Sequence, residues 1–192
     1  MNNISLEELK NIKSKYFESA RKNSPLFSDI GEVLELYKED IKKNGYVDIE
    51  KIIKDCKDIE LSFTKFENEN IDGNISFNND KYYIKINENK APARQRFTIA
   101  HEYSHYLFDK DMLKKDTHQD IIFYRTNDFK FKVPVDMKAN YYAASLLMPE
   151  TLFRNKHNEI NGDIYEMANF FKVSVLAIQV RYSQLGIFVN EW

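Results

Sequence analysis

Residues Arg94 to Lys110 read RQRFTIAHEYSHYLFDK, an apolar run in which two of the chain's four histidines lie four residues apart. On a helix the side chains of residues i and i+4 project from the same face, so His101 and His105 would stand side by side with Glu102 one step around. Two neutral imidazoles in this arrangement can ligate one metal ion, and the glutamate between them can reach a water bound to that ion. The pattern therefore predicts a metal centre on a helix.

A catalytic zinc ion generally has three protein ligands and one water, so a third ligand is expected. The candidates are Asp111 and His118 in the segment that follows, and Asp136 at the start of DMKANYYAASLLMPE. Asp136 is favoured because Asn140 lies four residues further on, so one helix face would present a carboxylate to the metal and an amide to a ligating histidine. A ligand at the spacing of Asp111 requires a chain reversal at a glycine, and Phe108 occupies the position of that glycine. No spacing rule supports His118. Both remain alternatives.

Patterns of apolar residues around this centre predict an α+β domain. Helical spacing with capping signals, including a proline at the start of the histidine helix, predicts several helices. The expected helices span residues 5–20, 28–44, 49–56, 92–108 and 136–148, with two short helices between 163 and 185.

Alternating polar and apolar residues predict strands just before the histidine helix. Ile59, Leu61 and Phe63 alternate with polar residues, and NISFNNDKYYIKIN reads as two strands joined by a turn at Asn79-Asp80. A further strand is expected at residues 121–124. These segments predict a small antiparallel sheet with an exposed edge that could hold an extended peptide.

The composition narrows the class of protein. A chain of 192 residues with 43% hydrophobic and 30% charged residues is long enough to bury a core, as one domain or as a domain with an appendage. Its 28 basic and 30 acidic side chains leave a net charge of −2, which gives no overall field for attracting nucleic acid or an anionic membrane.

The cysteine content and the start of the sequence indicate in which compartment the protein works. Cys56 is expected to be a small buried hydrophobe, and its lack of a partner cysteine fits a reducing environment. No signal-peptide pattern and no run of about 18 apolar residues is present in the sequence, which predicts a cytoplasmic protein.

RQRFTIAHEYSHYLF followed by DMKANYYAASLLMPE resembles the ImmA/IrrE family of zinc-dependent metallopeptidases. The resemblance extends backwards over VDIEKIIKDCKDIELSFTKF and IDGNISFNNDKYYIKIN and covers roughly residues 46–187. It implies a zincin-like, gluzincin-type fold with a small sheet packed on the histidine helix. The implied divisions are an N-terminal helical extension over residues 1–45, a metallopeptidase core over 46–160, and a helical tail resembling a helix-turn-helix over 161–192.

The resemblance also implies the roles of the site residues. His101, His105 and Asp136 would hold Zn²⁺, and Glu102 would act as general base. Asp136 stands where the family normally has glutamate, which is one methylene longer. Ser104 stands where glycine is usual, and its small side chain would still allow close helix packing near the metal. No tyrosine is singled out as a donor to the oxyanion.

Family resemblance implies a cytoplasmic endopeptidase that makes one regulatory cut in a helix-turn-helix transcriptional repressor encoded nearby, releasing genes of a mobile element or a stress response. The alternative is a catalytically weak or inactive module of the same fold that sequesters or inhibits a protein partner; Asp136 favours it and Glu102 opposes it. DNA binding by the tail is disfavoured because Lys172 and Arg181 are the only basic side chains of its two helices. A protein partner is expected, without direct nucleic-acid binding and without a membrane.

Overall fold

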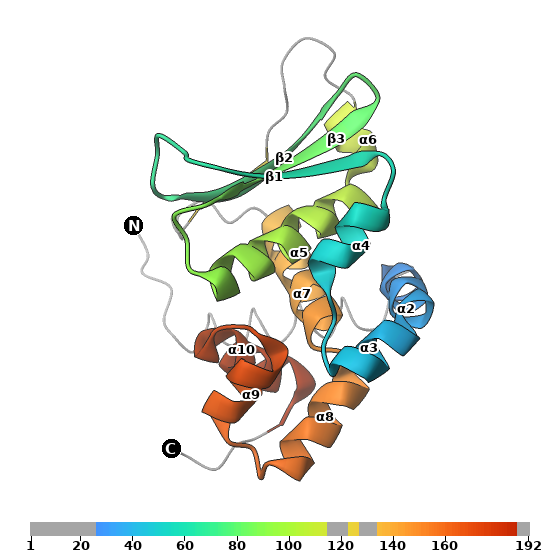
Figure 1. The fold of residues 1–192 in the computed structure, drawn as a ribbon, viewed down its shortest axis with the longest axis vertical. Helices are drawn as coiled ribbons and strands as arrows, with labels where there is room; N and C mark the ends of the chain where they lie inside the picture. The colour runs from blue at the N-terminus through green and yellow to red at the C-terminus, as the bar shows by residue number, and fades with distance from the viewer. Residues whose placement is uncertain (1–25, 115–122, 127–133, 188–192) are drawn as a thin grey trace.

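The computed structural model describes residues 26–114, 123–126 and 134–187, and the expected helix over residues 5–20 lies outside these ranges. The elements in chain order are α2 (Leu26–Leu36), α3 (Lys38–Asn44), α4 (Ile49–Asp55), β1 (Ile59–Thr64), β2 (Ile71–Asn78), β3 (Lys81–Asn87), α5 (Pro92–Phe108), α6 (Lys110–Lys114), β4 (Phe123–Thr126), α7 (Pro134–Leu147), α8 (Glu150–Glu159), α9 (Ile164–Phe171) and α10 (Val175–Leu185). The sheet lies over α5, with α8, α9 and α10 at the opposite end of the molecule (Figure 1). The expected α+β class is confirmed.

The segment expected as one helix over residues 28–44 forms two helices, α2 and α3, which are separated at Tyr37. Tyr37 has φ −101° and ψ 14°, although its N–H still donates a hydrogen bond to the Val33 carbonyl oxygen at 3.1 Å. α3 ends at Gly45, whose left-handed φ of 78° favours glycine. Asp48 caps α4 as expected, because its side chain accepts a hydrogen bond from the Lys51 N–H.

The described sheet has the strand order β1-β3-β2-β4. The expected hairpin is confirmed: β2 and β3 pair antiparallel, and Asn79 and Asp80 in their turn have positive φ values of 48° and 59°. β2 also pairs antiparallel with β4. A purely antiparallel sheet is the wrong expectation for β1, which pairs parallel with β3. The chain reverses between β1 and β2 and again at the hairpin, so β1 runs in the direction of the strand it joins.

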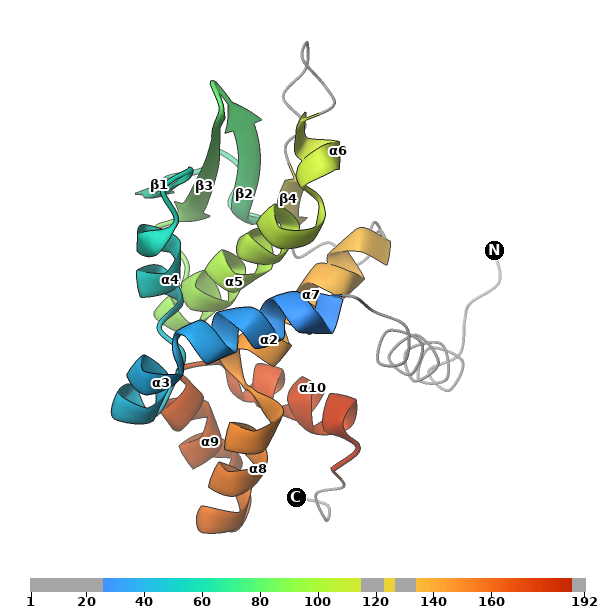
Figure 2. The same cartoon turned by 90° about the vertical axis from the view of Figure 1, so that its right-hand side faces the viewer.

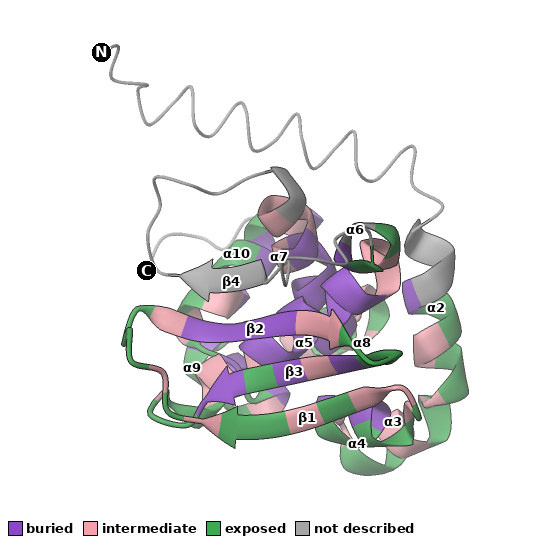
Figure 3. Ribbon diagram, turned by 90° about the horizontal axis from the view of Figure 1, so that it is seen from above, coloured by how far each residue is buried: buried purple, intermediate pink, exposed green. Residues whose placement is uncertain are grey.

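α5 is enclosed by its neighbours and has the bounds that the sequence predicts. Its nine consecutive residues Thr98–Tyr106 are all buried. Tyr82, Ile84 and Ile86 alternate as buried residues along β3 and form the inner face of the sheet. α4 and α7 contact other sides of α5, and burial in the sheet decreases from β2 towards the outer strand β1 (Figure 3). The histidine helix is therefore a central element of the core.

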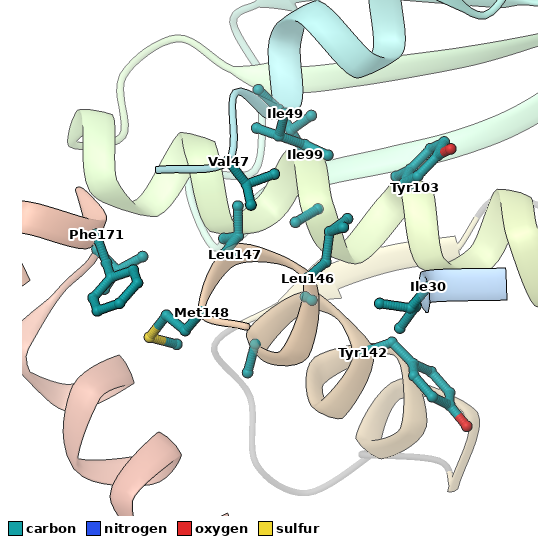
Figure 4. Packing of buried hydrophobic residues seen from close by; sticks show 14 of the residues in the cluster. Ile30, Val47, Ile49, Ile99, Tyr103, Tyr142, Leu146, Leu147, Met148 and Phe171 are labelled. Carbon is teal, nitrogen blue, oxygen red and sulfur yellow. The ribbon is translucent and has the colours of Figure 1, made fainter. Parts of the chain in front are cut away.

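α7 connects the core around α5 to the last helices. Leu146 and Leu147 of α7 lie near Ile99 of α5, and Met148 lies near Phe171 of α9 (Figure 4). α2 crosses α7 from another side (Figure 2). One continuous cluster of buried apolar side chains thus runs from the sheet to α9 and α10.

The last helices agree in part with the sequence patterns. α9 and α10 confirm the two expected short helices, and Lys172 between them adopts a left-handed φ of 54°. α8 is not marked by any apolar period because Phe153 is its one buried residue. No helix within the described ranges is both long enough and apolar enough to cross a membrane.

Both basic side chains of the tail helices make contacts within the protein. Lys172 Nζ lies 3.6 Å from the centre of the Tyr46 ring. Arg181 is 3% exposed and donates hydrogen bonds to the Met148 carbonyl and to the Ser145 hydroxyl, each at 3.0 Å. These contacts hold the tail helices to the rest of the fold.

Gly73 lies where β2 closely approaches α5, and its replacement tests this packing. A Cβ at Gly73 would lie 2.7 Å from Thr98 Cγ2 and 2.8 Å from the Lys85 carbonyl oxygen. Because the backbone atom cannot easily move aside, Gly73→Ala should lower the free energy of unfolding by about 1–3 kcal/mol, measured by urea denaturation. Gly31→Ala in α2 is the matched control, because its Cβ would meet nothing within 4 Å, and its stability should be unchanged or higher. Equal stability of Gly73→Ala and wild type would contradict the close approach.

Candidate metal centre

α5 places His101, Glu102 and His105 in the protein interior, where they are 1%, 0% and 0% exposed. The Nε2 atoms of the two histidines lie 3.1 Å apart, and their rings are nearly perpendicular, at 79°. Helical geometry accounts for this proximity, since residues four apart lie one above the other. The two Nε2 atoms therefore meet in one buried region.

Asp136 reaches the same region from the first turn of α7. Its Oδ1 lies 3.9 Å from His101 Nε2 and 3.7 Å from His105 Nε2. Two donors that are each about 2.0–2.1 Å from a tetrahedral zinc ion would be about 3.3 Å apart. The three observed separations bracket this value, so the donor set fits such an ion. α7 lies close enough to α5 for the short Asp136 side chain to reach the two histidine Nε2 atoms.

Each histidine also has a partner at its other ring nitrogen. His101 Nδ1 lies 3.1 Å from Asn140 Oδ1, and His105 Nδ1 lies 2.8 Å from Asp109 Oδ2. Asn140 is one turn after Asp136 on α7, whereas Asp109 is the residue that caps the C-terminus of α5. Because both acceptors face Nδ1, a neutral ring in either position carries its proton there and presents the Nε2 lone pair to the centre.

The electrostatic environment of the centre favours positive charge. Burial lowers the pKa of His105, but the hydrogen bond with Asp109 and the nearby carboxylates of Asp136 and Glu102 raise it by more, so that the pKa is about 9. A cation bound between the two imidazoles would experience the same field from these carboxylates. The Asp136 side chain is 24% exposed, so this donor is partly accessible to solvent.

Asp111 and His118 are the other two candidates for the third ligand. Asp111 is exposed on α6 and is not part of the group formed by the two histidines and Asp136. His118 lies outside the described residues. Ser104, at the position where glycine is usual in the family that the sequence resembles, is buried and donates a hydrogen bond to the Ala100 carbonyl at 2.8 Å. Its hydroxyl is therefore satisfied within α5.

Asp109 is a site residue that the motif does not single out. A signal is present in its position, because it follows His105 at the same four-residue spacing that joins the two histidines. That spacing brings its carboxylate back to the preceding turn, which is where His105 Nδ1 lies.

The chain is similar to proteins of a known family. A family model described as Peptidase_M78, IrrE N-terminal-like domain, matches residues 54–183. Metallopeptidase ImmA of Bacillus subtilis (strain 168) is 29% identical over 120 residues, which are 58% of this chain and 62% of that protein. A solved Mycobacterium tuberculosis transcriptional regulator matches with a TM-score of 0.59 and 14% identity, over 91% of this chain and 51% of the regulator, and so shares the fold.

The chain thus spans between half and two thirds of the length of these relatives. Because the family model covers well over half of its residues, the chain belongs to the Peptidase_M78, IrrE N-terminal-like, family.

Proposed function

We propose that this chain is a zinc-dependent endopeptidase whose metal ion is held by His101, His105 and Asp136. The observation that carries the proposal is the convergence of these three donors beside Glu102, within the residues that the peptidase family model covers. Two imidazole nitrogens and one carboxylate suit zinc, whereas magnesium and calcium prefer sites made of oxygen atoms.

Glu102 is the residue to which we assign the acid–base chemistry. It is buried next to His101 on α5, with an exposed fraction of 0%. A bound Zn²⁺ would polarise the attacking water and the scissile carbonyl. Glu102 would accept a proton from the attacking water and later donate it to the nitrogen of the leaving amine. The amide bond would break as that nitrogen takes up the proton.

The proposed substrate is a helix-turn-helix transcriptional repressor of the same cytoplasm, cut once in a linker. The support for this partner is the resemblance to the ImmA/IrrE family. A folded repressor presents extended backbone with free hydrogen-bonding groups in linkers, and such a segment can add to the edge of a sheet. The outer strands of the described sheet, β1 and β4, offer such edges.

Exposed apolar side chains on the tail support a docking role for α9 and α10. Tyr165 on α9 and Leu176 and Val180 on α10 are 74%, 66% and 43% exposed. Leu176 and Val180 are one turn apart and share a face of α10. A repressor bound there would be tethered to the peptidase, which raises the effective concentration of its linker at the metal centre.

The second candidate is a non-catalytic module that binds and inhibits a protein partner. The observation that favours it is the aspartate at the third-ligand position. Against it stand the spacing of the donor atoms, which fits zinc despite the shorter side chain, and the presence of Glu102 beside them.

We expect one zinc ion per chain in protein purified without added metal, measured by elemental analysis. Asp136→Ala should lose most of this zinc because two histidines alone form a weak site, whereas Asp136→Glu should retain it. The controls Asp111→Ala and His118→Ala remove the two alternative ligands and should keep the zinc. Full zinc in Asp136→Ala, together with loss in either control, would show that the ligand assignment is wrong.

Glu102→Gln separates chemistry from binding. The amide is nearly the same shape as the carboxylate and leaves the metal ligands intact, so zinc content and the melting temperature of the zinc-loaded protein should be retained. Loss of the general base should lower the rate of peptide cleavage by about 10² to 10⁴. Cleavage at the wild-type rate by this variant would exclude the proposed mechanism.

The partner is tested by mixing the purified protein with the helix-turn-helix protein encoded beside its gene and following fragments by mass spectrometry. One discrete cut is expected, which a chelator and Glu102→Gln should abolish. Leu176→Asp should slow the cut at limiting partner concentration without changing zinc content, whereas Asn155→Asp, at an exposed position on α8, should cut normally. Binding without any cut would favour the inhibitory module, and efficient digestion of unfolded casein would contradict specificity.

A further inference from the structure

The two histidines of the centre are held by chemically different groups. His101 Nδ1 faces the neutral amide oxygen of Asn140 at 3.1 Å, whereas His105 Nδ1 faces the Asp109 carboxylate at 2.8 Å. Hydrogen bonds that involve a charged partner are shorter and stronger than those between neutral groups. The two rings are therefore held in place with different strength.

We infer that Asp109 is a positioning residue of the metal centre: its carboxylate accepts the Nδ1–H of His105, fixes Nε2 as the metal-binding nitrogen, and makes His105 the stronger of the two histidine ligands. The inference rests on the proposed metal centre and concerns how the His105 ring is oriented within it.

The position of Asp109 is itself fixed by the backbone. As the C-cap of α5, it donates its N–H to the His105 carbonyl oxygen at 2.8 Å. Its side chain is 14% exposed, so water competes little for the carboxylate. The same residue therefore contacts His105 twice, through the backbone and through the ring, and the imidazole has little freedom to rotate.

A carboxylate at Nδ1 changes the ligand in two ways. It excludes the tautomer in which Nδ1 would carry the lone pair, and it increases the electron density at Nε2, which strengthens the bond to a cation. Asp136 is a short ligand and its Oδ1 is 3.7 Å from His105 Nε2, a wider separation than the 3.1 Å between the two histidines. A firmly held and more basic His105 would offset the looser third donor.

The test uses zinc alone as the probe and measures affinity by competition with a chelator, independently of peptidase activity. Removing a group that orients a ligating histidine typically weakens metal binding by about 10–100-fold, and Asp109→Ala should fall in this range. Asp109→Asn keeps an acceptor without the charge, so its affinity should lie between those of Asp109→Ala and wild type. Asp111→Asn is the matched control: it removes one negative charge from an exposed position two residues away and should bind zinc like wild type.

A second measurement separates positioning from a general effect on folding. In zinc-loaded protein with ¹⁵N-labelled histidine, the Nδ1 proton of His105 should give a protected signal that Asp109→Ala abolishes. Asp109→Ala should lower the melting temperature of the metal-free protein, because it removes the partner of the buried His105 ring. The readout is therefore the rise in melting temperature on adding zinc, which should be smaller in the variants than in wild type.

The possible outcomes are distinct. Equal zinc affinity of wild type, Asp109→Asn and Asp109→Ala would overturn the inference while leaving the proposed metal centre intact. Equal weakening by Asp109→Asn and Asp111→Asn would also overturn it, since general electrostatics would then explain the effect. A wild-type protein that binds no zinc would overturn the proposed centre and this inference with it.

Discussion

The burial of α5 is the constraint on which the rest of the structure depends. A helix enclosed by a sheet and by other helices normally carries apolar side chains on every face, because a buried polar group costs free energy unless it is paired. α5 instead brings five polar residues into the interior, each at most 2% exposed: Thr98, His101, Glu102, Ser104 and His105. The elements around α5 supply polar atoms to match, which include the amide and the carboxylate that α7 brings and the carboxylate at the helix end.

The position of α7 therefore matters as much as that of α5. Asp136 and Asn140 lie towards the N-terminal end of α7, while Ser145 and Met148, at its other end, accept hydrogen bonds from the buried Arg181 of α10. Leu146 and Leu147 fill the space between the two ends and the core. The tail helices thus help to fix the helix that carries Asp136, the proposed third ligand, although they lie at the opposite end of the molecule from the sheet (Figure 1).

The features that the sequence predicts well are those set by residues close together in the chain. The bounds of α5, the Asp48 cap and the turn at Asn79 and Asp80 depend on local signals, and the structure agrees with them. The same local geometry brings His101 and His105 together. The parallel pairing of β1 is different, because alternation marks a strand without naming its neighbour. Long-range contacts are likewise invisible in a pattern, so the burial of Arg181 could not be read from the sequence.

The close approach of β2 to α5 has a consequence for the histidine pair. Thr98, His101 and His105 are spaced i, i+3 and i+7, so they lie along one stripe of α5. β2 approaches α5 so closely at Gly73 that a Cβ there would lie 2.7 Å from Thr98 Cγ2 on that stripe, and this close packing restricts rotation of the helix about its axis. A turn by one residue, about 100°, would carry both imidazoles away from α7 together. Transplanting the histidine motif into another protein would thus require packing that fixes the rotation of the helix as well as the ligands themselves.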